Sequence, residues 1–163
     1  MFLRSDMEDQ VVHIHKFGLA VIENNRLLLC QPYAFEDLIL PGGMKEGAET
    51  HIENLTREIR EELGEDAVLD ETSLRYLGRF EDIAAGRTKR LVEIDLYSGK
   101  ISGALKPSSE IKSLHWFAAF DDKNRLSPII KNQILPFLIR EGLLDDGARD
   151  RSRGLASGPN KVK

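Results

Sequence analysis

The segment at residues 41–65, PGGMKEGAETHIENLTREIREELGE, constrains the fold of this 163-residue chain more than any other. A Pro-Gly-Gly sequence, expected to form a turn, precedes a stretch with helical periodicity. Thr50 and Glu53 form the T-x-x-E pattern of a capping box, and Gly64 supplies a typical helix end. Apolar residues recur on one helical face at Ile52, Leu55, Ile59 and Leu63. The segment therefore predicts a helix from Thr50 to Gly64 that packs this face against a core.

Three carboxylates, those of Glu58, Glu61 and Glu62, fall on the flank of this helix, roughly a third of a turn from the apolar stripe. Like charges three or four residues apart destabilise an isolated helix by about 0.2–0.5 kcal/mol per pair. A solvated helix face tolerates this repulsion, whereas a bound divalent cation, which prefers oxygen ligands, would offset it. The helix by itself fits both interpretations.

The remainder of the chain alternates strand patterns with turns. Runs rich in β-branched or apolar residues predict strands at 11–23, 26–31, 38–41, 73–83, 90–99 and 111–120. Ser127 and Pro128 predict the start of a second helix, with the serine as cap, and Pro136 should kink or split that helix before its end near Glu141. Strands on both sides of a helix indicate an α/β layered domain. We expect this domain at residues 11–144, after a flexible N-terminus (1–10) and before a mobile polar tail (145–163).

Composition excludes several classes of function. The net charge of −4 provides no global attraction for DNA, RNA or an anionic membrane. No apolar run approaches the roughly 20 residues that span a bilayer. Cys30 is the only cysteine, so an intrachain disulfide is impossible, which fits a reducing cytoplasm.

The acidic helix resembles the signature of the Nudix hydrolases. The pattern reads Gly43, five residues, Glu49, seven residues, Arg57-Glu58-Ile59, one residue, Glu61-Glu62, one residue and Gly64. The seven positions other than Ile59 would coincide by chance on the order of once in a million such chains. This chain departs from the usual pattern at Ala48, Asn54, Leu55 and Glu65. The resemblance implies an α/β/α sandwich with a mixed β-sheet between helices, and cleavage of nucleoside diphosphates linked to another moiety.

The resemblance also implies roles for the acidic residues. Glu58 and Glu62 would be ligands of Mg²⁺ or Mn²⁺, Glu61 a further ligand or the general base, and the Gly42 carbonyl an additional oxygen ligand. Arg57 and Glu49 would hold these ligands in place. One further carboxylate, Glu110 in the loop KPSSEI, is either another base or ligand, or a solvated side chain.

The sequence leaves the substrate open. Tyr33, Phe35 and Phe80 are candidates to stack on a base, although each can equally belong to the core, and Arg87 is either a phosphate contact or part of a solvated turn. Signals of other branches of the family are absent, which favours a (d)NTP pyrophosphatase that releases a nucleoside monophosphate and pyrophosphate. An ADP-ribose or nucleotide-sugar pyrophosphatase and a non-catalytic nucleotide sensor are the alternatives. A homodimer is compatible with the resemblance.

Overall fold

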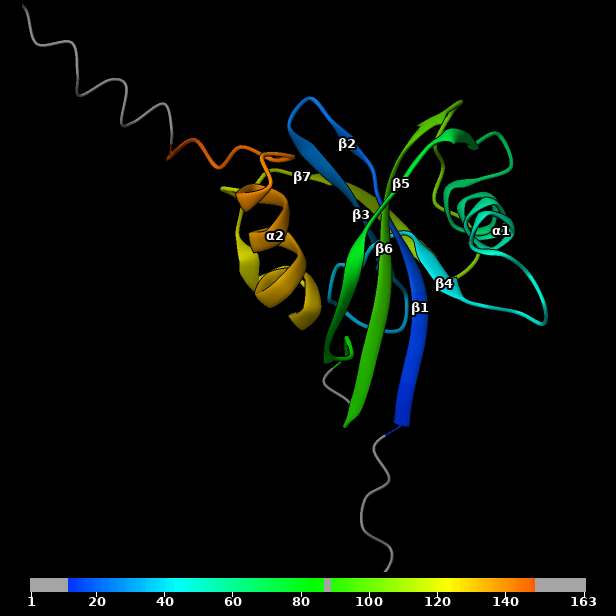
Figure 1. Ribbon diagram of the computed structural model, residues 1–163, viewed down its shortest axis with the longest axis horizontal. Coiled ribbons are helices and arrows are strands. Elements are labelled where there is room, and N and C mark those ends of the chain that lie inside the picture. Colours follow the sequence, from blue (N-terminus) through cyan, green and yellow to red (C-terminus); the bar gives the residue numbers. More distant parts are fainter. Residues whose placement is uncertain (1–11, 87–88, 149–163) are drawn as a thin grey trace, which may run out of the picture.

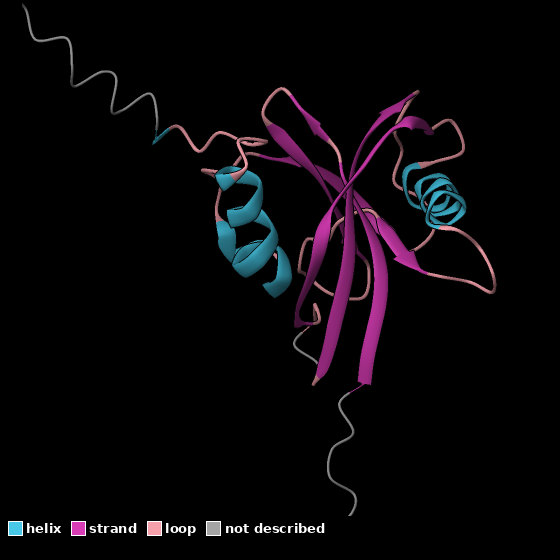
Figure 2. Cartoon of the chain, in the orientation of Figure 1, coloured by secondary structure: helices cyan, strands magenta, loops and turns pink. Residues whose placement is uncertain are grey.

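The structure, a computed structural model, describes residues 12–86 and 89–148. Strands occupy its centre, with one helix on either side (Figure 1). These two helical regions and the strands between them are distinguished by colour in Figure 2. This is the predicted sandwich. The expected flexible N-terminus and residues 149–163 of the expected tail lie outside the described residues.

Within the described residues, seven strands form two sheets. A mixed sheet has the order β4-β1-β6-β5, made of β4 (Gly42–Met44), β1 (Val12–Ala20), β6 (Arg90–Ser102) and β5 (Val68–Ile83). Within it β1 and β6 run parallel, and the other neighbours run antiparallel. The second sheet is antiparallel, with the order β2 (Ile22–Glu23), β3 (Arg26–Pro32) and β7 (Ile111–Phe117).

Helix α1 (His51–Leu63) forms where the capping box predicts it. The Thr50 hydroxyl accepts a hydrogen bond from the Glu53 backbone N–H at 3.2 Å. Gly64 ends the helix with a φ of 99°, which favours glycine. Three residues of the apolar stripe are fully buried, namely Leu55, Ile59 and Leu63. At about 1.5–3 kcal/mol for each buried side chain, this contact anchors α1 on the strands.

The second helical region covers the opposite side of the strands. It contains a short 3₁₀ turn (Lys123–Arg125), a π-helical stretch (Ile130–Ile134) and α2 (Leu135–Arg140). Pro136 cannot donate a backbone hydrogen bond and its ring clashes with the carbonyl four residues earlier. The helix accommodates it by widening into the π-helical stretch directly before it, which is the predicted disruption.

Three details differ from the expectations. Residues 38–41 form only isolated bridges, Cys30 with Ile39 and Leu38 with Leu126, whereas the strand β4 lies at Gly42–Met44, where a turn was expected. Gly42 allows this pairing because a Cβ on it would collide with the Phe17 carbonyl of β1. The hydroxyl of Ser127 does not cap the second helix, because it has no hydrogen-bond partner in the described part of the chain.

None of the described helices is long and apolar enough to cross a membrane.

Candidate active site

Helix α1 separates its three carboxylates by burial. Glu58 and Glu62, one turn apart, are only 8% and 1% exposed, while the side chain of Glu61 is 49% exposed. The first two face β4, since the Gly42 N–H donates to Glu62 Oε1 at 2.9 Å and Glu58 lies against Gly43. The helix thus presents two carboxylates to the protein interior and a third to solvent.

Arg57 connects these carboxylates to the loop before the helix. Its guanidinium donates to both oxygens of Glu49, at 2.8 and 3.1 Å, and to Glu58 Oε1 at 2.9 Å. A longer contact of 3.3 Å reaches Glu61 Oε2. The hydrogen bonds from Arg57 to Glu49 outweigh the opposing effect of burial and lower the pKa of Glu49 to about 2. Glu49 is therefore a permanent anion that orients Arg57 toward Glu58.

Asn54 is a site residue that the sequence interpretation missed. It is fully buried, and its Nδ2 group donates to Glu49 Oε1 at 2.9 Å and to the Met44 carbonyl at 2.8 Å. It thereby ties the helix to the end of β4. In the sequence, Asn54 stood out only as a departure from the usual signature. A polar side chain at a buried helical position needs a hydrogen-bond partner, so that departure was the one available sign of its role.

Two glycines shape the inner wall of the site. A Cβ on Gly43 would overlap the carboxylate of Glu58, so only glycine allows Glu58 to lie against β4. The Gly42 amide points at Glu62, as described above. The predicted role for the Gly42 carbonyl as a metal ligand stays a prediction.

Burial sets the electrostatics of the carboxylate pair. It raises the pKa of Glu62 well above the ordinary value, against the opposing hydrogen bond from Gly42, and the negative charge of Glu58 raises it further. Burial likewise raises the pKa of Glu58, although Arg57 opposes this shift. The charge of Glu110 raises both pKa values, so its carboxylate lies within electrostatic range of the pair.

The donor set fits a hard divalent cation. In the described residues no three His, Cys, Asp or Glu side chains form a ready-made metal cluster. Glu58 and Glu62 nevertheless place two carboxylates out of water, where negative charge is unfavourable without a counter-ion. Oxygen ligands of this kind suit Mg²⁺ or Mn²⁺. Glu58 and Glu62 are thus the residues that would hold the ion.

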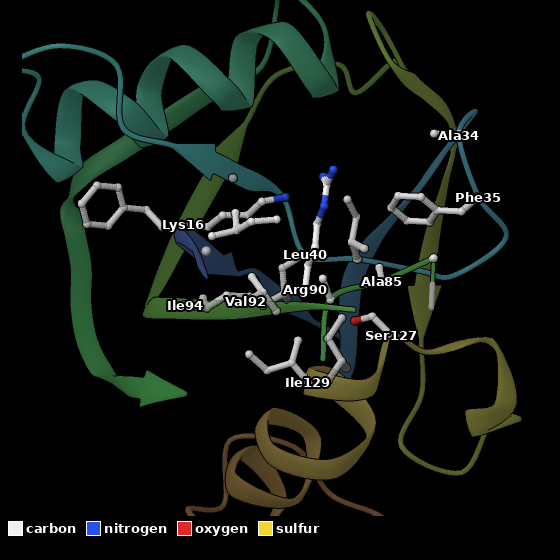
Figure 3. Close-up of a pocket in the computed structure, with 18 residues that line it drawn as sticks. Lys16, Ala34, Phe35, Leu40, Ala85, Arg90, Val92, Ile94, Ser127 and Ile129 are labelled. Atoms are coloured by element: carbon white, nitrogen blue, oxygen red, sulfur yellow. The ribbon is translucent and has the colours of Figure 1, made fainter. Parts of the chain in front are cut away.

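A cavity of about 400 Å³ adjoins the carboxylates at Gly42. Its walls are mostly apolar and come from β1, β6, the loop at 34–40, the loop at 84–86 and the residues that open the second helix (Figure 3). The volume lies in the range of small-molecule sites. Phe35 lines it, as expected of a residue that stacks on a base. Lys16, Arg90 and Ser127 also line it. Sequence reasoning missed Lys16 and Ser127, whereas Arg90 belongs to the basic loop at 84–90, which was considered either a phosphate contact or a solvated turn.

Two of the other predicted substrate contacts, Tyr33 and Phe80, do not line this cavity. Tyr33 is 70% exposed and does not line it. Phe80 does not line it either, because its ring packs against that of Phe137 with centroids 5.1 Å apart. Arg87 lies outside the described residues.

A mixed sheet between helices, with paired carboxylates beside a small-molecule cavity, defines a hydrolase of the Nudix class. The family model of the NUDIX domain matches residues 14–128, and the chain belongs to this family. No curated protein matches the chain significantly.

Solved structures share the fold. A MutT NUDIX hydrolase from Burkholderia pseudomallei is 23% identical, with a TM-score of 0.64 over 77% of this chain and 98% of that one. A MutT protein from Methanosarcina mazei Go1 is 19% identical, with a TM-score of 0.64 over 82% and 97%. An ADP-ribose pyrophosphatase from Streptococcus suis 89-1591 is 18% identical, with a TM-score of 0.52 over 81% and 93%. At these identities the likeness establishes the fold alone.

Proposed function

We propose that this protein hydrolyses a pyrophosphate bond in a small nucleotide, with a nucleoside triphosphate or deoxynucleoside triphosphate as substrate. The products are a nucleoside monophosphate and pyrophosphate. The observation that carries the proposal is the pair of buried carboxylates, Glu58 and Glu62, beside a cavity of about 400 Å³. A nucleoside in the cavity would direct its phosphates toward the acidic helix, since Gly42 lines the cavity and donates to Glu62.

The acidic residues divide metal binding and proton transfer between them. Glu58 and Glu62 would hold Mg²⁺ or Mn²⁺, which when bound would neutralise phosphate charge and make water more acidic. Glu61 takes the proton from the attacking water, because it is the most exposed of the three carboxylates on this flank. Glu110 is the competing candidate for this proton transfer, since its charge already reaches both buried carboxylates.

Arg57 and Glu49 position this machinery without touching the substrate. The bidentate contact between them fixes the guanidinium in one orientation, from which it also holds Glu58. Partners of this kind typically contribute 10–100-fold to metal affinity or activity.

Phosphate-product release from a nucleotide panel tests the proposal. The panel contains NTPs, dNTPs, ADP-ribose, nucleotide sugars and dinucleoside polyphosphates, each with Mg²⁺ or Mn²⁺. We expect turnover of (d)NTPs that Glu62→Gln abolishes and Glu53→Gln retains. Glu53 is the matched control, an exposed carboxylate on the same helix. Turnover restricted to ADP-ribose or a nucleotide sugar would replace the substrate assignment.

Full activity in Glu62→Gln would refute the site itself. Tight nucleotide binding without turnover of any member of the panel would indicate a nucleotide sensor instead of an enzyme.

A further inference from the structure

Two cationic side chains in the cavity wall have no partner in the described part of the chain. Lys16 on β1 is half-buried and Arg90 on β6 is exposed, and both line the cavity. Neither side chain forms a hydrogen bond or an ion pair within residues 12–86 and 89–148. Arg57 and Arg79, by contrast, are each held by carboxylates. Two unpaired cations at a cavity favour an anionic ligand.

Both side chains leave the same face of the sheet. The parallel strands β1 and β6 pair Lys16 with Ile94 and Val12 with Arg90. Positions two or four residues apart on a strand share a face, so Lys16 and Arg90 project into one cavity. Figure 3 shows both cationic ends directed toward the acidic helix, whereas the Ser127 hydroxyl lies at the opposite side of the cavity. The positive charge of the lining is therefore concentrated at the end nearest the helix.

The two cations lie where the cavity meets the acidic helix. Among the described residues that line the cavity, no other side chain is charged. Burial raises the pKa of Glu62, and the positive charge of Lys16 is one of the groups that oppose this rise. The ammonium group is therefore within electrostatic range of that carboxylate. A ligand that extends from the apolar part of the cavity to Glu62 passes the two cations.

We propose that Lys16 and Arg90 bind the phosphate attached directly to the nucleoside and keep the monophosphate product bound when no metal is present. The inference rests on the proposed function, because it assigns a phosphate of the same substrate. A nucleoside in the apolar part of the cavity brings its first phosphate to the two cations, and the remaining phosphates continue toward Glu58 and Glu62. Guanidinium and ammonium groups both form charge-assisted hydrogen bonds with phosphate oxygens.

This arrangement treats the two products differently. The nucleoside monophosphate keeps the apolar contacts of the cavity together with both cations. Pyrophosphate lies at Glu58 and Glu62, whose carboxylates repel it unless a divalent cation is bound. We therefore expect the metal-free protein to bind the monophosphate well and pyrophosphate weakly.

Equilibrium binding in EDTA tests this assignment without catalysis. Calorimetry gives dissociation constants for the common ribonucleoside and deoxyribonucleoside monophosphates, for the nucleoside of the tightest one, and for pyrophosphate. We expect this monophosphate to bind at least about tenfold more tightly than its nucleoside and than pyrophosphate, as for hydrogen bonds to a charged group. Equal affinity for the monophosphate and its nucleoside would overturn the proposal, as would pyrophosphate binding as tight as the monophosphate or no binding of any monophosphate.

Variants identify the residues responsible. Lys16→Met and Arg90→Met should each weaken monophosphate binding at least about fivefold and leave the affinity for the nucleoside unchanged. Lys16→Arg and Arg90→Lys keep the charge and should keep most of the affinity. Lys131→Met is the control, because Lys131 is exposed and does not line the cavity. Monophosphate affinity that is unchanged in both methionine variants would overturn the proposal.

A purely structural role for Lys16 gives a different result. If its ammonium group only balances the charge of Glu62, Lys16→Met should lower the Tm of the metal-free protein and leave monophosphate affinity unchanged. That combination would exclude Lys16 as a phosphate contact and contradict the proposal.

The outcome is separable from that of the proposed function. Absence of hydrolysis across the nucleotide panel, with monophosphate binding that both methionine variants weaken, would refute catalysis alone. Hydrolysis that Glu62→Gln abolishes, with monophosphate binding unaffected by Lys16→Met and Arg90→Met, would refute only the phosphate assignment.

Discussion

Replacing Arg57 with methionine tests how the acidic helix is held together. The guanidinium bonds both oxygens of Glu49 and one of Glu58. Methionine retains an unbranched side chain with good helix propensity and removes every donor. Because Glu58 is buried, the substitution leaves its negative charge without a cation.

The expected loss of stability follows from this burial. Removing one partner of a fully buried ion pair typically costs about 3–5 kcal/mol. The Arg57 side chain keeps 23% of its surface exposed, so water recovers part of the loss. We expect a decrease of about 2–3 kcal/mol in the free energy of unfolding for metal-free protein at pH 8.

The loss should depend on pH. Burial already raises the pKa of Glu58, and removal of the guanidinium raises it further. The folded variant then binds more protons than its unfolded state as the pH falls toward the ordinary carboxyl range. Its stability therefore recovers on acidification, and the deficit at pH 5 should be smaller than at pH 8.

Urea unfolding followed by circular dichroism in EDTA measures the effect at both pH values. Arg60→Met is the matched control, because Arg60 lies on the exposed side of the same helix and its side chain forms no hydrogen bond or ion pair within residues 12–86 and 89–148. This control should stay within about 0.5 kcal/mol of the wild type. An equally small change for Arg57→Met at pH 8 would refute the reasoning, as would a deficit that is the same at pH 5.

Three further predictions concern glycine packing, metal binding and acid stability. Gly43→Ala should lower kcat at least about tenfold, because its Cβ displaces the Glu58 carboxylate. At Gly47 a Cβ meets no atom within 4 Å, so Gly47→Ala strains only a backbone with a φ of 56° and should retain most of the activity; equal activity of the two variants would contradict this. Mg²⁺ at about 100 times its dissociation constant should raise the Tm by about 5–10 °C in calorimetry, and persistence of this shift in Glu62→Gln would place the ion elsewhere. Burial opposes ionisation of Asp95, but hydrogen bonds lower its pKa to about 2. The donors are Arg79, His15 and Tyr76. Because the folded pKa lies below the unfolded value, this stabilisation is complete above about pH 4 and is lost toward pH 2. Asp95→Asn should make the urea midpoint change less with pH over that range. A pH dependence equal to that of the wild type would contradict the role of these hydrogen bonds.

Local chemistry was readable from the sequence. The start and end of α1 depend on contacts between residues three or four positions apart, so Thr50, Glu53 and Gly64 predicted them correctly. The buried stripe follows from helical periodicity alone. The disruption near Pro136 also has a local cause, the missing N–H of one residue.

Features that depend on distant segments were not readable. Gly42–Met44 forms a strand because β1 lies beside it. The two glycines by themselves predict a turn and do not indicate the neighbouring strand. Ser127 was expected to cap a helix, as a serine before a proline usually does, but only the tertiary structure shows that its hydroxyl stays unpaired at the cavity. Lys16 and Arg90 line the same cavity only because β1 pairs in parallel with β6.

The signature is best understood as a solution to one electrostatic problem. A helix must keep two carboxylates away from water and still fold before any cation binds. Gly43 clears the volume for Glu58, the Gly42 amide supplies a hydrogen bond to Glu62, and Arg57 provides one partial counter-charge. That compensation is incomplete, since the pKa values of both glutamates stay raised. The remaining excess of negative charge is what a divalent cation would neutralise, so the same burial that destabilises the metal-free helix strengthens its attraction for the ion.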